Sequence, residues 1–246
     1  MAVGYNPRIV TDKLVFCVDV TNTKSYPGSG TSLYDLSGNN YDGTMTDVTI
    51  TSDGHMSFNG QNPGSAVAFP ESNISKDPSL YLGDSSGKLT YECWINKQGT
   101  NHSAGDARVM SSDASDYTTL TIVQSADNRI RFYVDGANTN LTAPSSYAIS
   151  NNTWYHIVAT YDSSITTDAI KIYRNGELIA SKDYTFSGTY GDGTSRPFAI
   201  ASNVESAVQY SNGVNAYIDI CRIYGKPLSA DEVKQNFNAT RGRFGI

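Results

Sequence analysis

The chain is poor in cysteine and has no long hydrophobic run. It contains 246 residues, and its 3 cysteines, Cys17, Cys93 and Cys221, each lie within an apolar stretch. An odd number of cysteines in such positions favours buried free thiols over a disulfide framework. Apolar residues never continue for the roughly 18 positions that a membrane span needs, and residues 1–14 lack the pattern of a signal peptide. We therefore expect no membrane contact and no secretory leader.

Positive charge is also scarce. The chain has 18 Lys and Arg against 24 Asp and Glu, a formal net charge of -6, and no cluster of basic residues. Because nucleic acids are bound largely through their phosphates, we do not expect a nucleic acid as a partner. The histidines, His55, His102 and His156, are not spaced like a zinc-binding pair. The sequence also lacks a Gly-x-Ser-x-Gly elbow and a phosphate-binding glycine loop. It therefore contains none of these signatures of enzyme activity.

Short apolar or alternating runs recur between turn residues, which is typical of an all-β fold. We expect strands at residues 14–20, 56–59, 66–70, 89–96, 107–111, 118–124, 129–134, 154–161, 169–174, 177–184, 198–202 and 216–224. Asn175-Gly176 predicts a tight antiparallel hairpin, because both positions tolerate a positive φ. Helical periodicity occurs only after Ser229, where Ser229 and Glu232 have the spacing of a capping box. The sequence thus predicts two antiparallel sheets packed face to face, with one short C-terminal helix.

Asp219 lies among apolar residues in the last expected strand. If that strand alternates without interruption, Asp219 shares a face with Cys221 and Ile223. A carboxylate on a core face must be ion-paired, hydrogen-bonded or bound to a metal, because burying an isolated charge is very costly. Asp219 is therefore a candidate ligand.

Five segments, in their order and spacing, resemble a laminin-G-like, concanavalin A-like jelly roll. They are residues 14–19, 34–40, 58–60, 89–95 and 154–162. The resemblance implies a jelly-roll domain over residues 14–240, an N-terminal arm of residues 1–13 and a C-terminal tail of residues 241–246. Residues 24–31 and 236–246 also resemble the version of this module found in tailed-phage structural proteins. The two arginines and the Phe of the tail suit either docking on an acidic partner or a solvated end.

The family often holds a structural calcium ion, and the resemblance implies a site for one Ca2+ here. The matching positions are Asp35, Asn39 and Asp219, with Asp42 as an added oxygen donor, and such oxygen ligands suit calcium. Many relatives carry a second acidic residue after the last Asp, where this chain has Ile220. Alternatively, Asp35 and Asn39 form Asx turns and Asp219 accepts backbone hydrogen bonds.

Binding residues tend to lie on loops, and three polar loops at residues 97–107, 187–197 and 204–213 are candidates for sugar recognition. The candidate carbohydrate-binding residues are Tyr190, Asp192, Arg196 and Tyr210. Solvent exposure or contacts to a neighbouring virion subunit are the alternative for these loops, and the frequency of polar loops favours it.

Catalysis on this fold needs two carboxylates beside a sugar bond, and the strand pattern Glu-x-Asp-x-x-Glu is absent. Glu92 is the only Glu in a central strand, and we interpret it as an outward-facing residue because Glu is seldom buried unless paired. His156 is interpreted as a surface or rim residue. Neither residue predicts a catalytic site.

The resemblance implies a non-enzymatic phage virion structural protein, either a capsid decoration or a tail or fibre component. Its lectin-like domain would adhere to host or environmental glycans. It would be made in the host cytoplasm, contact other virion proteins and be present in multiple copies per particle. The alternatives are a free carbohydrate-binding module and a glycoside hydrolase on the same fold.

Overall fold

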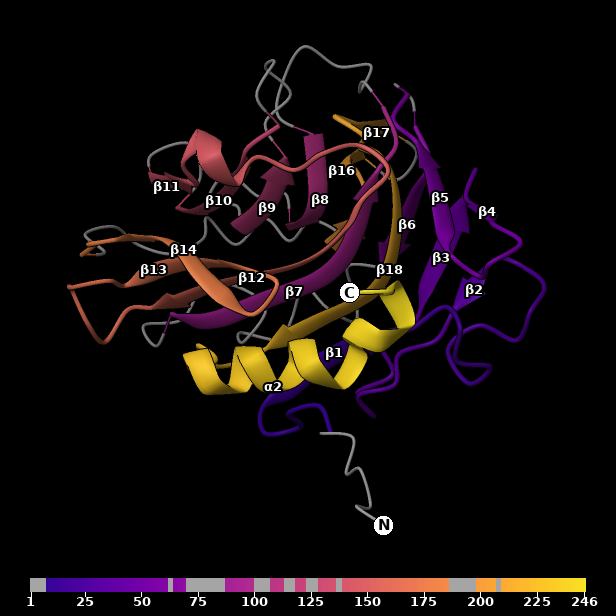
Figure 1. Ribbon diagram of the computed structural model, residues 1–246. Coiled ribbons are helices and arrows are strands. Elements are labelled where there is room, and N and C mark those ends of the chain that lie inside the picture. The colour runs from indigo at the N-terminus through magenta and orange to yellow at the C-terminus, as the bar shows by residue number, and fades with distance from the viewer. Residues whose placement is uncertain are drawn as a thin grey trace.

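The computed structural model describes residues 8–61, 64–69, 87–99, 107–112, 118–122, 128–135, 139–185, 198–206 and 209–246. Within these ranges two antiparallel sheets face each other (Figure 1). Sheet A has the order β14-β13-β12-β7-β18-β5-β4, and β1 also pairs with β18. Its strands are β14 Glu177–Lys182, β13 Ile170–Arg174, β12 Trp154–Asp162, β7 Lys88–Lys97, β18 Asn215–Tyr224, β5 Met56–Asn59, β4 Thr49–Ile50 and β1 Leu14–Val18.

Sheet B has the order β11-β10-β9-β8-β15-β6-β3-β2. Its strands are β11 Thr139–Thr142, β10 Ile130–Asp135, β9 Thr118–Ile122, β8 Ala107–Ser112, β15 Phe198–Ile200, β6 Ala66–Phe69, β3 Gly43–Thr46 and β2 Ser32–Leu33. A separate small pair joins β16 Asn203–Ser206 to β17 Gln209–Ser211. The expected all-β sandwich of antiparallel sheets is therefore confirmed.

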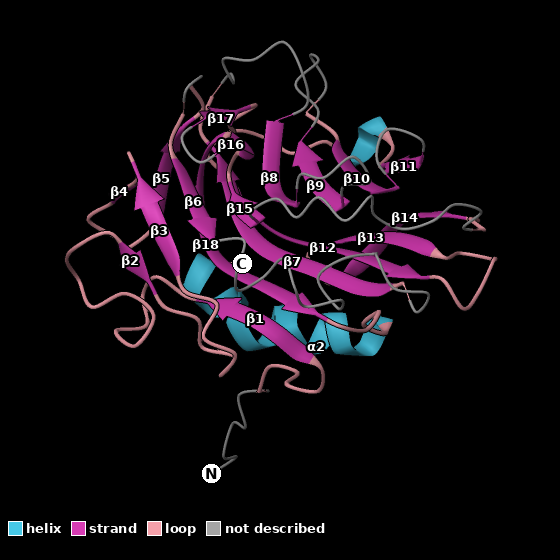
Figure 2. Ribbon diagram, turned by 180° about the vertical axis from the view of Figure 1, so that it is seen from behind, coloured by secondary structure: helices cyan, strands magenta, loops and turns pink. Residues whose placement is uncertain are grey.

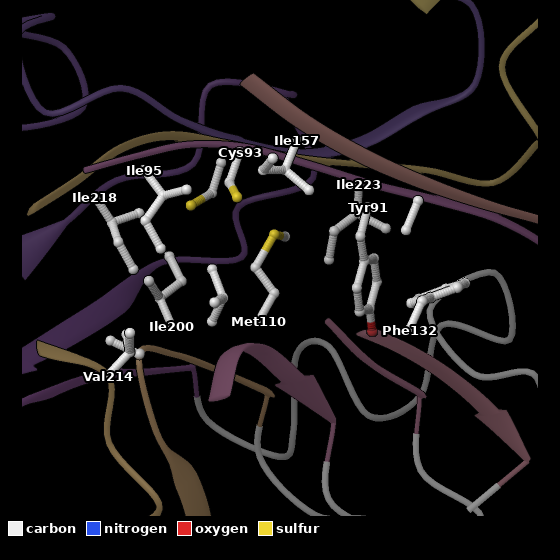
Figure 3. Close-up of a cluster of buried hydrophobic side chains, with 14 of the residues drawn as sticks. Tyr91, Cys93, Ile95, Met110, Phe132, Ile157, Ile200, Val214, Ile218 and Ile223 are labelled. Carbon is white, nitrogen blue, oxygen red and sulfur yellow. The ribbon is translucent and has the colours of Figure 1, made fainter. Parts of the chain in front are cut away.

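The core lies between the two sheets. Ile95 of β7 and Ile218 of β18 point from sheet A toward Ile200 of sheet B, and Tyr91 approaches Phe132 in the same layer (Figure 3). All five side chains are buried. Alternation along each strand sends every second side chain into this layer, which explains why apolar periodicity located most of the strands.

The expected free thiols are confirmed. Cys17, Cys93 and Cys221 are all buried and unbonded to one another. Burial raises the pKa of each thiol, since the thiolate would lose its hydration. These cysteines are apolar packing residues of the sandwich.

The Asn175-Gly176 hairpin between β13 and β14 is also confirmed, with φ of 53° at Asn175 and 81° at Gly176.

A methyl group on Gly176 would lie 3.1 Å from Cδ1 of Phe237. We expect Gly176→Ala to lower the free energy of unfolding by about 1–2 kcal/mol, because the left-handed conformation strains an L side chain. Urea denaturation checks this. Leu178→Ala on the same hairpin, where the side chain is 49% exposed, is the control and should change little.

The C-terminal helices cover the outer face of sheet A (Figures 1 and 2). Helix α2 spans Ala230–Thr240 and is followed by the short 3-10 helix η2, Arg241–Phe244. The predicted capping box is confirmed, since the Ser229 side chain accepts from the Glu232 N–H and the Glu232 side chain accepts from the Ser229 N–H. Phe237 of α2 stacks on Trp94 of β7, with ring centroids 5.9 Å apart.

The face predicted for Asp219 is wrong. The pairing of β18 with β7 shifts register between Ile218 and Cys221, which is a β-bulge. Ile218 and Cys221 both point into the core, so the alternation restarts across the bulge. Asp219 therefore contacts residues on the outer, helix-covered side of sheet A, although it is fully buried.

Candidate functional site

A buried polar cluster lies between sheet A and α2. Glu92 of β7 accepts a hydrogen bond from Arg222 of β18 at 2.5 Å, and its other oxygen accepts from the Asn236 side chain of α2 at 2.7 Å. His156 of β12 lies with Nε2 3.0 Å from the same carboxylate. The exposure expected for Glu92 as an outward-facing residue and for His156 as a rim residue is wrong, because both are fully buried. The outer face of these strands is covered by a helix instead of solvent.

The charge of Glu92 is stabilised by its partners. Burial raises the pKa of this carboxyl, but the neighbouring Arg222 charge and the hydrogen bond with His156 outweigh burial and bring the pKa down to about 2. Burial lowers the pKa of the Arg222 guanidinium, but the Glu92 charge outweighs burial and raises it, so Arg222 also stays charged. The cluster is thus a neutralised ion pair that ties β7 to β18 and α2.

This lowered pKa predicts acid sensitivity. A carboxyl whose pKa falls from 4.5 to about 2 on folding contributes about 3 kcal/mol above pH 4.5, and this stability is lost as the pH falls toward 2. We expect the free energy of unfolding of Glu92→Gln to depend less on pH than that of the wild type across this window. Urea denaturation at several pH values measures both slopes, and equal slopes would contradict the assignment.

Asn236 extends the cluster to the N-terminal segment. Its side-chain oxygen accepts from the Val10 N–H at 2.7 Å, and its amide nitrogen also donates to the Tyr224 hydroxyl at 2.9 Å. That hydroxyl donates to the Val10 carbonyl at 3.1 Å. The part of the expected N-terminal arm that the structure describes, residues 8–13, is thereby joined to α2.

The expected C-terminal tail packs on the domain itself. Phe244 stacks on Trp94 with ring centroids 4.0 Å apart. The Arg243 guanidinium donates to both oxygens of Asp19 at 2.9 Å and to Asp219 at 2.5 Å. We call Arg243 and Phe244 with these partners the C-terminal clasp. The acidic partners of the Arg243 guanidinium thus belong to the same chain. Phe244 is buried, which contradicts a solvated end at that residue, whereas Arg243 stays exposed to solvent while it is paired.

Asp35, Asn39 and Asp42 lie together in the segment before β3. Asp35 accepts from the N–H groups of Cys17 and Ser37, both at 2.9 Å, and Asp42 accepts from the Asp35 N–H at 2.9 Å. The Asn39 amide donates to the Val15 carbonyl at 2.7 Å. The contact of Asp35 with the Ser37 N–H is the Asx turn given above as the alternative to metal binding, whereas Asn39 and Asp42 make hydrogen bonds that this alternative did not include.

Asp219 has two side-chain partners of its own. One oxygen accepts from Arg243 and the other lies 2.8 Å from Nδ1 of His55. Among the described residues no group of three His, Cys, Asp or Glu side chains is arranged to hold a metal ion. A shared calcium ion fits this donor set poorly, because a guanidinium already occupies the Asp219 carboxylate. The calcium site stays a prediction, and the change in melting temperature on adding calcium or a chelator tests it.

The candidate carbohydrate-binding residues cannot be compared with the structure. Tyr190, Asp192 and Arg196 lie outside the described residues, and Tyr210 is described only as a backbone position in β17. No helix within the described ranges is long and apolar enough to span a membrane.

The fold and a sequence match together identify the class of this protein. The family described as the concanavalin A-like lectin/glucanases superfamily, in its laminin-G form, matches residues 84–234. This match covers more than half of the chain. The chain therefore belongs to the concanavalin A-like lectin/glucanases superfamily, and the resemblance inferred from its motifs is confirmed. No curated protein sequence matches it.

Solved structures show the same fold at low identity. Trypanosoma rangeli sialidase in complex with sialic acid is 13% identical, with a TM-score of 0.63 over 95% of this chain and 34% of that one. The receptor-binding domain of botulinum neurotoxin C/D mosaic serotype is 16% identical, with a TM-score of 0.64 over 93% and 51%. The binding domain of botulinum neurotoxin DC in complex with SialylT is 15% identical, with a TM-score of 0.63 over 93% and 52%. The chain thus spans between about a third and half of their lengths.

Proposed function

We propose that this chain is a phage virion structural protein, a capsid decoration or a tail or fibre component, whose lectin-like domain binds glycans without hydrolysing them. The position of Glu92 favours binding over hydrolysis. Its carboxylate is buried beneath α2 and held by Arg222, His156 and Asn236. A glycoside hydrolase needs two carboxyl groups that reach the sugar bond. The sugar complexes of structurally similar proteins support a glycan as ligand.

The virion location is supported by the resemblance of residues 24–31 and 236–246 to tailed-phage structural proteins. Assembly in the host cytoplasm is compatible with three buried free thiols, which persist where the environment is reducing. Other virion proteins would then be its partners. Display in many copies would raise the avidity of a weak glycan site.

Two measurements test the proposal. Mass spectrometry and cryo-electron microscopy of purified particles should find this polypeptide on the capsid or tail, and its absence would leave a free carbohydrate-binding module. A glycan array, with calcium and with a chelator, should show binding. Turnover of a bound glycan would instead support a hydrolase.

A further inference from the structure

Arg174, the last residue of β13, is a half-buried cation without an acidic partner. Its neighbour across the strands is Glu177 of β14, but the Glu177 carboxylate pairs with Lys234 of α2 at 2.9 Å. No Asp or Glu oxygen in the described part of the chain lies within 4.0 Å of the Arg174 guanidinium. A charge that is partly removed from water is costly unless it is paired, so this position favours a counter-charge from outside the chain.

Two tyrosine rings hold the guanidinium in place. Its Cζ lies over the ring of Tyr147, in the short 3-10 helix η1 Ser145–Tyr147, at 5.1 Å from the centroid, and over the ring of Tyr155 at 5.4 Å. Both contacts attract the cation to the electron-rich face of a ring. The Tyr155 hydroxyl is itself positioned, since it accepts from the Ser150 N–H at 3.3 Å. A side chain that is ordered in advance loses less entropy when a ligand binds.

One edge of the guanidinium remains available. Nη1 donates to the Ala148 carbonyl at 3.3 Å, and this is the only hydrogen bond of the Arg174 side chain with residues that the structure describes. Nε and Nη2 are not among the buried polar atoms that lack a partner, so they reach solvent. These two nitrogens lie on the same side of the guanidinium plane. An arginine can bind a carboxylate through two parallel hydrogen bonds from such a pair.

A carboxylate therefore fits this position better than a neutral group does. A hydroxyl can accept from Nε or Nη2, but it leaves the positive charge uncompensated. The chain carries a net charge of -6, which opposes an acidic ligand at long range. At physiological ionic strength that repulsion is screened over about 8 Å, so at contact distance the unpaired guanidinium decides.

We propose that Arg174 binds the carboxylate of an acidic glycan, one that carries a uronic or sialic acid, through Nε and Nη2. This proposal rests on the proposed glycan-binding function and names a site and a ligand class for it. Arg174 and the two tyrosines belong to β13, η1 and β12, and none of them lies in the three polar loops that the sequence indicates.

An array of oligosaccharides that carry glucuronate or sialic acid, beside neutral ones, tests the ligand class, and calorimetric titration with the best acidic one gives the Kd. Arg174→Gln should weaken this Kd by about tenfold or more, because a charge-assisted contact is lost. Arg174→Lys should weaken it by at least about threefold, since an ammonium cannot form the two parallel bonds. Arg241→Gln is the matched control, because it removes the same charge from an exposed arginine and should leave the Kd unchanged.

The outcomes separate the site from the function. If the wild type binds no glycan, the proposed function fails and this inference fails with it. If the wild type binds only neutral glycans, glycan binding stands but the acidic class is wrong. An acidic glycan that Arg174→Gln binds as tightly as the wild type, or that Arg241→Gln loses equally, would overturn the assignment to Arg174. The melting temperature of each variant identifies loss of fold. If Arg174→Gln is unstable, full affinity in Arg174→Lys would overturn the two-bond contact.

Discussion

Replacing Arg222 with Met is expected to lower the free energy of unfolding by about 3–5 kcal/mol, because the buried Glu92 carboxylate would lose its cationic partner. Glu92 is fully buried and Arg222 is 3% exposed, so water cannot take over this role without opening the helix–sheet contact. Urea denaturation at pH 7 with both proteins measures the difference. The effect should exceed that of any exposed ion pair, such as Lys234 with Glu177.

The double variant Glu92→Gln with Arg222→Met is the control for this prediction. Removing both charges leaves no uncompensated ion beneath α2, so the double variant should be more stable than Arg222→Met alone. A loss below about 1 kcal/mol for Arg222→Met would contradict a stabilising role for the pair. So would a double variant whose loss equals the sum of the two single losses.

Most of the sandwich was predictable because apolar periodicity is a local property. The expected strands at residues 56–59 and 89–96 correspond to β5 and β7, and the hairpin and the capping box lie where their residues indicate. The short strands β3 and β11, Gly43-Thr-Met-Thr and Thr139-Asn-Leu-Thr, were missed. Their runs are brief and polar, and pairing with neighbouring strands defines them more than their own pattern does.

The polar interior was predicted poorly, because its partners are distant in sequence. Glu92 meets Arg222 across 130 residues and Asn236 across 144. Alternation shows that Glu92 lies opposite the core, but it does not show that a helix covers that side. One signal was available: Trp94 and the expected helix both carry apolar surface that must be buried somewhere, and the outer face of sheet A satisfies both.

The position of Asp219 was missed for a different reason. A single extra residue in β18 reverses which side chains face inward, and no residue type in Ile218-Asp219-Ile220-Cys221 marks a bulge. The argument that a buried Asp219 needs a partner is nevertheless confirmed, since Arg243 and His55 contact it. The physical requirement was predictable from the sequence, whereas the identity of the partner required the fold.

The C-terminal clasp leads to the second large prediction. Deleting residues 241–246 is expected to lower the free energy of unfolding by about 3–5 kcal/mol, because Phe244 leaves the Trp94 ring and Arg243 leaves the buried Asp219 carboxylate. Thermal and urea denaturation of the shortened chain measure this loss. The fluorescence of Trp94 and Trp154, which both contact Phe244, should also report increased exposure to solvent.

Deleting only Ile246 is the matched control for that truncation. Ile246 is 41% exposed, so its removal should change the free energy of unfolding by no more than about 0.5 kcal/mol. Equal stability of the two shortened chains would mean that the clasp contributes nothing to the fold. A loss confined to the longer deletion would instead assign residues 241–246 to the folded domain, where Phe244 also packs against the Trp154 ring.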